Sequence, residues 1–209
     1  MDAKAEKQRL REKIWRELQE RGIARFPLPC WGRIPNFKGA ERAAENLRKL
    51  EEWRKAKVIF CSPDSPQRKV RENTLKDGKI LVMASPRLKS GFLLIKPEKV
   101  KGREAYASTI RGAFRFAEQV QEFPKPDLVV TGSVAVDIHG NRLGKGGGYG
   151  DRELEIIRSR FGKVPVATTV HDMQVVDSVP SEPHDQKVDI IVTPTRTIRV
   201  KFNDFQIDE

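Results

Sequence analysis

Five short, mainly apolar runs constrain the fold of this chain more than any other feature. They occupy residues 58–61, 80–83, 128–131, 164–170 and 188–192, and two weaker candidate strands occupy 92–95 and 197–202. Runs of this length suit strands that are buried on both faces, and segments with helical periodicity lie between most of them. Strands that alternate with helices favour a parallel sheet. The sequence therefore predicts an α/β fold with a mostly parallel sheet that helices cover on both faces.

The helices are predicted from apolar residues spaced three and four apart. Leu10, Ile14 and Leu18 form such a stripe within a helix over residues 2–21. Further helices are predicted over 40–55, from the turn at 62–66 to residue 77, over 103–121 and over 151–161, whereas three prolines make 25–38 a loop. Because 209 residues suffice for one substantial core, residues 1–209 are predicted to form a single domain, with 1–57 as a candidate helical cap.

The chain is strongly basic. Its net charge of +11 comes from 40 Lys and Arg residues against 29 Asp and Glu residues. Such a charge is compatible with anionic small ligands, with nucleic acid or with a salt-rich surface. The basic residues are spread along the chain and interleaved with acidic ones, which favours the first and third explanations over nucleic acid.

Composition argues against several other classes. No apolar run approaches the ~20 residues of a membrane span, and the first turns carry charges where a signal peptide would be apolar. The only cysteines, Cys30 and Cys61, are expected to be free thiols, which predicts a cytoplasmic protein. Two cysteines and three scattered histidines do not make a zinc site.

The main functional signal is the stretch over 142–152, Arg-Leu-Gly-Lys-Gly-Gly-Gly-Tyr-Gly-Asp-Arg, in which five glycines fall within seven positions. A backbone without Cβ atoms is able to lie against a ligand and to turn its N–H groups toward an anion. The helix that follows adds the positive end of its dipole. Arg142, Lys145 and Arg152 supply cationic donors, and Asp151 offers oxygen ligands suited to Mg²⁺ beside a polyphosphate. These features predict a nucleotide-phosphate site.

A flexible turn is the alternative interpretation of this stretch. It is not a Walker A loop, because no Lys-Ser or Lys-Thr closes it, and it does not fit the GxGxxG pattern of dinucleotide-binding folds. The residues alone therefore indicate phosphate binding and leave the reaction open.

The same stretch resembles the glycine-loop signature of the 5-formyltetrahydrofolate cyclo-ligase family, also called the methenyltetrahydrofolate synthetases. The resemblance extends to residues 7–11, 126–132 and 180–193. The family's usual pattern has two aromatic residues before the Asp-Arg pair, whereas this chain has Tyr149 followed by Gly150. Residues 33–39, 170–177 and 193–196 are similar to a divergent branch, the methenyltetrahydrofolate synthetase domain-containing proteins.

The resemblance implies the three-layer fold shared with ribose-phosphate isomerase and coenzyme A transferases. It also implies an ATP- and Mg²⁺-dependent ligase of one-carbon metabolism that acts on a reduced folate, as a monomer or a homodimer. Such an enzyme converts 5-formyltetrahydrofolate to 5,10-methenyltetrahydrofolate and releases ADP and phosphate. The formyl oxygen attacks the γ-phosphate of ATP, and the second folate nitrogen then closes the ring as phosphate leaves.

The resemblance also assigns roles to residues of this sequence. Lys145 and Arg152 are the expected catalytic cations, and Asp151 is the expected Mg²⁺ ligand. The expected ATP-binding residues are Lys7, Arg11, Arg142, Gly144, Lys145, Gly146, Gly147, Gly148, Tyr149 and Asp151.

Candidate substrate contacts lie in two loops. Trp31, Arg33 and Phe37 suit a pocket for a flat ligand such as a pterin, although the aromatic rings also suit the anchoring of an irregular loop to the core. Arg87 follows a predicted strand, where α/β proteins place ligand contacts, and is a candidate for binding the substrate carboxylate. A solvated turn arginine is the alternative there.

Two histidines are followed by an aspartate, at 171–172 and 184–185. Neighbours in an extended chain point to opposite sides, so neither pair is predicted to be a catalytic dyad. Loop anchoring and a ligand role both stay open for His184 and Asp185.

Two other functions stay open at this point. One is an ATP-dependent enzyme with a non-folate substrate, either thiamine-related or of the formamide type. The other is a non-enzymatic protein that binds nucleotide or RNA through a degenerate site. The intact glycines at 146–148 and the Asp-Arg pair at 151–152 argue against degeneracy.

Overall fold

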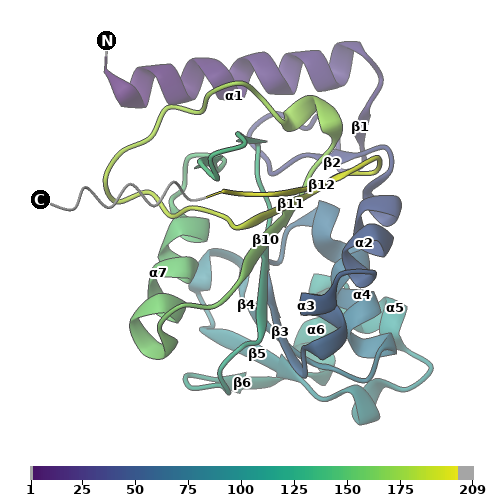
Figure 1. Cartoon of the computed structure of the whole chain (residues 1–209). Helices are drawn as coiled ribbons and strands as arrows, with labels where there is room; N and C mark the ends of the chain where they lie inside the picture. The colour runs from purple at the N-terminus through teal and green to yellow at the C-terminus, as the bar shows by residue number, and fades with distance from the viewer. Residues whose placement is uncertain (1, 202–209) are drawn as a thin grey trace, which may run out of the picture.

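The computed structural model describes residues 2–201, and an eight-stranded sheet forms the centre of this described part (Figure 1). Five strands in its middle run parallel, namely β3 (Val58–Cys61), β4 (Ile80–Ala84), β7 (Leu128–Thr131), β10 (Val166–Thr169) and β11 (Ile190–Val192). Antiparallel strands close both edges, namely β5 (Phe92–Ile95) and β6 (Glu118–Val120) on one side and β12 (Thr197–Arg199) on the other. The prediction of a mostly parallel α/β sheet is confirmed.

The order of the strands is β12-β11-β10-β7-β3-β4-β5-β6. β3 and β7, whose paired residues lie 69 positions apart in the chain, are therefore neighbours in the middle of the sheet. The loops that leave their carboxyl ends meet at one edge, which is where open α/β sheets place ligands.

Helices cover both faces of the sheet, which gives three layers (Figure 1). One face carries α2 (Ala40–Arg48), α3 (Glu51–Lys55), α4 (Arg68–Lys76), α5 (Glu104–Ala107) and α6 (Ile110–Phe116). The other face carries α7 (Tyr149–Phe161). Leu47 and Trp53 belong to the apolar core of the first face, and Leu154 and Ile157 belong to that of the second. The predicted likeness to ribose-phosphate isomerase and coenzyme A transferases stays a prediction.

Helix α1 (Ala3–Glu20) lies apart from these layers, across one end of the sheet (Figure 1). Its apolar stripe of Ile14, Trp15 and Leu18 is buried in a third cluster with Val134 and Leu143. Val134 precedes and Leu143 ends the small hairpin of β8 (Ala135–Val136) and β9 (Arg142–Leu143). Within the candidate cap over 1–57, α1 thus lies across the sheet end, whereas α2 and α3 are part of the helical layer on the sheet face. The single domain over 1–209 stays a prediction.

Two predicted helices differ from the structure. The helix over 40–55 is interrupted at Lys49 and Leu50, which separate α2 from α3. The helix over 103–121 is replaced by α5, α6 and β6. Thr109 starts α6 as its N-cap, because its hydroxyl accepts a hydrogen bond from the Gly112 N–H at 3.0 Å.

The predicted loop over 25–38 lies between two short strands that pair with each other. These are β1 (Ala24–Arg25) at its start and β2 (Asn36–Phe37) at its end.

Buried charged side chains fix the loops at the carboxyl end of the sheet. Arg71 on α4 donates to the carbonyl oxygens of Ser62 and Asp64, each at 2.8 Å, and to that of Ser108 at 2.9 Å. Because this guanidinium is only 2% exposed and its partners are backbone carbonyls, it holds the segment after β3 in one conformation.

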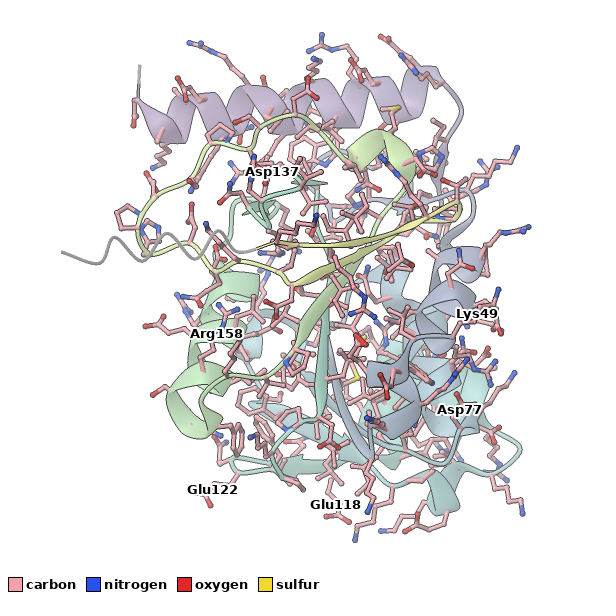
Figure 2. The ribbon with its side chains drawn as sticks, viewed as in Figure 1. Lys49, Asp77, Glu118, Glu122, Asp137 and Arg158 are labelled. Carbon is pink, nitrogen blue, oxygen red and sulfur yellow. The ribbon has the colours of Figure 1, made fainter. Side chains whose placement is uncertain are left out.

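Asp137 plays a similar part in the turn after β8 (Figure 2). Its carboxylate accepts hydrogen bonds from the N–H groups of His139, Asn141 and Val179 at 2.9 to 3.1 Å. This buried carboxylate therefore joins the β8–β9 hairpin to the segment that runs on toward residue 185. In Figure 2 it lies directly beneath α1.

None of the described helices is both long enough and apolar enough to cross a bilayer. Cys30 and Cys61 are free and buried.

Candidate active site

A cavity of about 490 Å³ opens at the carboxyl end of the sheet. Its walls come from segments that are far apart in the chain: α1, the loops after β3 and β4, the glycine loop, and the loop before β11. The residues of these segments are mostly charged or glycine. This wall composition suits a polyanion bound beside a smaller organic group.

The glycine loop forms one wall. Gly148 has a φ of +75° and is the N-cap of α7, and Gly146 has a φ of +111°. These left-handed conformations favour glycine, so the sequence lets the loop turn sharply into the first turn of the helix. Gly144 to Gly148 all line the cavity, as predicted, together with Lys145 and Tyr149. Lys145 is exposed to the cavity, and no ion pair with another described residue holds its ammonium group.

Helix α1 forms a second wall and brings Lys7 and Arg11 to the cavity, as predicted. Arg11 Nε donates to the Gly144 carbonyl oxygen at 2.7 Å, which ties α1 to the glycine loop. Lys4, one turn earlier in α1, also lines the cavity and was not among the predicted residues.

Lys7 is paired with two carboxylates of the loop before β11. Its Nζ lies 2.6 Å from Asp185 Oδ2 and 3.2 Å from Glu182 Oε2. Although burial alone would raise the pKa of Asp185, the hydrogen bonds from Lys7 and from the Glu182 N–H hold that pKa below its ordinary value. Burial opposes the charge of Lys7 as well, but the two carboxylates raise its pKa above the ordinary lysine value.

Glu182 and Asp185 form a cluster with His184. Their ligand atoms lie within 4.8 Å of one another, and all three residues line the cavity. The sequence left the role of His184 and Asp185 open, and it gave no sign that Lys7 contacts this loop, because 178 residues separate Lys7 from Asp185.

Arg142 lies deep in the glycine-loop wall, with its side chain 3% exposed. Its Nε donates to the Gly132 carbonyl oxygen at 2.7 Å, and its Nη1 lies 3.6 Å from Asp151 Oδ1. The same Asp151 oxygen accepts a hydrogen bond from the Gln186 N–H at 3.2 Å. The expected Mg²⁺ ligand therefore stands in the first turn of α7, between Arg142 and the loop before β11.

Because Gly150 has no side chain, the Arg142 guanidinium is able to occupy the space beside it. A Cβ atom at Gly150 would lie 2.4 Å from Arg142 Nη2 and 3.0 Å from its Cζ, which is too close for an unshifted side chain. The departure from the family's second aromatic residue thus has a local cause: a larger side chain at 150 is incompatible with Arg142 in this position.

Gly150→Ala is therefore expected to move Arg142. Alanine would otherwise stabilise a helical position by about 1 kcal/mol, but the displaced, buried guanidinium outweighs that gain, and we expect a net loss of about 1–2 kcal/mol. Thermal unfolding measures the change. In an Arg142→Ala background the same substitution should be neutral or stabilising, so a double-mutant cycle without coupling would contradict the contact.

Among the predicted catalytic and ATP-binding residues, Arg152 is the one that the structure places outside the cavity lining. It is exposed, does not line the cavity, and stacks over the Tyr149 ring with 5.5 Å between its Cζ and the ring centroid. The predicted catalytic role of Arg152 stays a prediction.

The four predicted substrate contacts separate into two pairs. Arg33 and Arg87 line the cavity, and Arg87 has a φ of +56° that is uncommon outside glycine. Trp31 and Phe37 do not line it. Phe37 is buried beside the His171 ring at 6.1 Å, and Trp31 packs on Trp15 with 5.4 Å between ring centroids. The loop-anchoring alternative describes these two rings better.

Two carboxyl side chains that the sequence did not indicate also line the cavity. Asp64 follows β3, and Glu153 lies on the inner side of α7. Burial, and then the neighbouring Asp64 charge, raises the pKa of Glu153 to about 8. The rule that ligand residues follow parallel strands could have indicated Asp64. No such signal exists for Glu153, which looks in the sequence like any polar residue of a helix.

Comparisons with known proteins agree with this geometry. A family model described as the 5-formyltetrahydrofolate cyclo-ligase family matches residues 3–194. A methenyltetrahydrofolate synthase domain-containing protein of Bos taurus is 42% identical over 204 residues, which cover 92% of this chain and 53% of that protein. The chain thus spans about half the length of such curated relatives. A 5-formyltetrahydrofolate cyclo-ligase of Escherichia coli is 37% identical over 70 residues, 34% of this chain and 37% of that protein.

A solved structure has the same fold. The NMR structure of a 5,10-methenyltetrahydrofolate synthetase of Aquifex aeolicus superimposes with a TM-score of 0.61 and covers 97% of this chain and 99% of its own. At 22% identity, this likeness concerns the fold alone.

Proposed function

Because this chain belongs to the 5-formyltetrahydrofolate cyclo-ligase family, we propose that it catalyses the ATP-dependent cyclisation of 5-formyltetrahydrofolate to 5,10-methenyltetrahydrofolate. ADP and phosphate are the other products. The observation that carries the proposal is the convergence of Lys7, Arg11 and Lys145 with the glycine loop around one cavity. Lys7 and Arg11 are more than 130 residues from Lys145 in the chain, and phosphate binding explains why cationic and N–H donors from such distant segments line one cavity.

In the proposed reaction this chain mainly positions and neutralises charge. N–H groups of the glycine loop and the N-terminus of α7 bind ATP phosphates, and Lys145, with no competing ion pair among the described residues, contacts the phosphoryl group that is transferred. Arg33 and Arg87 also line the cavity and are available for the anionic part of a folate. Reduced folate and ATP are thus the proposed ligands.

The chemistry of Asp151 fits Mg²⁺. One of its oxygens already accepts from Gln186 and faces Arg142, and the carboxylate is a hard ligand that retains a second oxygen. Asp185 and Glu182 are equally hard ligands, but Lys7 already neutralises them. Bound Mg²⁺ would supply further neutralisation of the phosphates, and Asp151 is the residue we propose to hold it.

The cytoplasm is the proposed location, which the free state of both cysteines supports. A monomer or a homodimer is the proposed assembly, as the family resemblance implies.

A spectrophotometric assay tests the proposed function. Purified protein mixed with ATP, Mg²⁺ and 5-formyltetrahydrofolate should produce the absorbance of the methenyl product, with one ADP formed for each product molecule. Omission of ATP, or its replacement by a nonhydrolysable analogue, should remove the signal. ATP binding without any methenyl product would refute folate as the substrate and would leave the phosphate site intact.

A further inference from the structure

Ring closure in the reaction proposed above must move a proton from the attacking nitrogen to the departing phosphate, and the cations that bind the phosphates cannot accept it on the way. When the second folate nitrogen attacks the phosphorylated formyl carbon, a C–N bond forms, the C–O bond to phosphate breaks, and the N–H proton must leave. A side chain beside the reacting atoms accepts such a proton, and aspartate and glutamate are among the groups that do so. The inference below rests on the proposed function.

Five carboxyl side chains line the cavity: Asp64, Asp151, Glu153, Glu182 and Asp185. Three of them are engaged. Asp151 faces Arg142 and accepts from Gln186, and Glu182 and Asp185 bind Lys7. Within the described residues 2–201, neither Asp64 nor Glu153 has an ion pair within 4.0 Å. These two carboxyl groups are therefore the ones available to a substrate.

Asp64 is the more accessible of the two. It is half-buried, whereas Glu153 is 6% exposed. Its position is fixed from two sides. Arg71 binds the carbonyl oxygens of Ser62 and Asp64, and Asp64 Oδ2 lies only 3.2 Å from where a Cβ of Gly132 would be. The absence of a side chain at Gly132 is what lets this carboxylate approach the end of β7.

Asp64 also lies near the groups that we propose for phosphoryl transfer. Lys145 and Arg142 line the same cavity as Asp64, and their positive charges, with that of Arg71, act on its carboxylate. The formyl carbon is one bond away from the oxygen that receives the phosphoryl group, and the attacking nitrogen is bonded to that carbon in the product. A proton acceptor must therefore lie beside the phosphoryl site, and Asp64 satisfies this requirement.

We propose that Asp64 is the proton acceptor of ring closure. Its carboxylate takes the N–H proton of the attacking folate nitrogen as the C–N bond forms. Phosphate departs with the electron pair of the broken C–O bond and receives that proton from Asp64, which restores the carboxylate and gives hydrogen phosphate. Atoms and charges balance without a further reactant.

The environment of Asp64 supports this role. Burial raises its pKa above the ordinary aspartate value, and the cations Lys145, Arg142 and Arg71 oppose the rise. A carboxylate with a raised pKa is a better base than an ordinary aspartate. These three cations and Glu153 are the charged groups that face it from the glycine loop, β9, α4 and α7.

The test separates ring closure from phosphoryl transfer in single turnovers. Stopped-flow absorbance follows the methenyl product, and acid-quenched samples give the amount of ADP formed. In Asp64→Asn we expect the methenyl rate to fall by about 10²–10⁴-fold while ADP formation stays within a few-fold of wild type. Glu155→Gln is the control, because it removes the same charge from an exposed position of α7. Circular dichroism and thermal unfolding establish that both variants fold.

The pH profile gives a second readout. The base must be ionised to accept the proton, so the wild-type rate of ring closure should rise with pH. This rising part of the pH–rate profile should lie above the pH range in which an ordinary aspartate titrates. The profile of Asp64→Asn should lack it. Equal losses of ADP and methenyl formation would mean that Asp64 positions the substrate instead, and an unchanged rate would exclude any role; both results overturn the inference. If wild type makes no methenyl product at all, the proposed function itself fails, and the inference falls with it.

Discussion

Asp151→Ala is expected to lower turnover of 5-formyltetrahydrofolate by about 100-fold or more, because it removes the proposed Mg²⁺ ligand, the carboxylate that stands between Arg142 and the loop before β11. The fold should persist. The side chain is 27% exposed, and its contacts are one hydrogen bond from the Gln186 N–H and one ion pair of 3.6 Å. We therefore expect a loss of no more than about 1 kcal/mol in unfolding free energy. Steady-state kinetics and thermal unfolding measure the two effects.

Asp151→Asn separates charge from shape in the same experiment. The amide oxygen still accepts from Gln186, but the carboxylate charge is gone. We expect the asparagine variant to be nearly as slow as the alanine variant and to need more Mg²⁺ for half-maximal rate. Wild-type turnover in either variant would exclude Asp151 as the metal ligand.

Lys7→Met is the second substitution with a large expected effect. It leaves the carboxylates of Glu182 and Asp185 without their cation, with side chains 31% and 9% exposed. Unpairing a fully buried pair costs about 3–5 kcal/mol, and the partial exposure of Glu182 reduces this to about 2 kcal/mol, or roughly 4–8 °C in Tm. The variant should also bind ATP less tightly. Lys13→Met, an exposed position on α1, is the control and should change neither property.

The stabilisation from this pair should depend on pH in a defined direction. The pKa of Asp185 is lowered by folding, so its contribution is full above the ordinary value of 3.8 and is lost as pH falls below it. The pKa of Lys7 is raised, so its contribution is full below 10.5 and is lost as pH rises above it. The difference in unfolding free energy between wild type and Lys7→Met should therefore be largest between about pH 4 and pH 10. A constant difference below pH 4 would contradict the pairing.

The sequence predicted the central sheet well because its strands are buried on both faces and appear as uninterrupted apolar runs. It predicted poorly where pairing with a distant segment decides the structure. Residues 118–120 continue a helical pattern in the sequence, yet they pair with β5 as an edge strand. A helical periodicity carries no information about such a partner.

In the candidate site, too, features encoded in one segment were easier to predict than contacts between distant segments. The glycine loop was predicted from its residue types, and Lys7 and Arg11 from the family resemblance of their segment. The structure brings all of them to one cavity, and their ATP-binding roles stay predictions. The contacts of Lys7 with Asp185 and of Gly150 with Arg142 depend on how separate segments pack, and no spacing in the sequence encodes them. Trp31 and Phe37 show the reverse: their residue types suit a pocket, but the packing of Trp15 and His171 uses both rings elsewhere.

Helix α1 has a consequence of a thermodynamic kind. It supplies a wall of the cavity and is attached to the rest of that cavity by Lys7 and Arg11, whose partners belong to two other walls. Docking of this helix and binding of a ligand in the cavity are therefore linked equilibria. A ligand that contacts all three walls raises the equilibrium constant for docking of α1, and docking raises the affinity for the ligand by the same factor. Amide hydrogens of α1 should accordingly report on ligand binding, by slower exchange, before any other helix of the fold does.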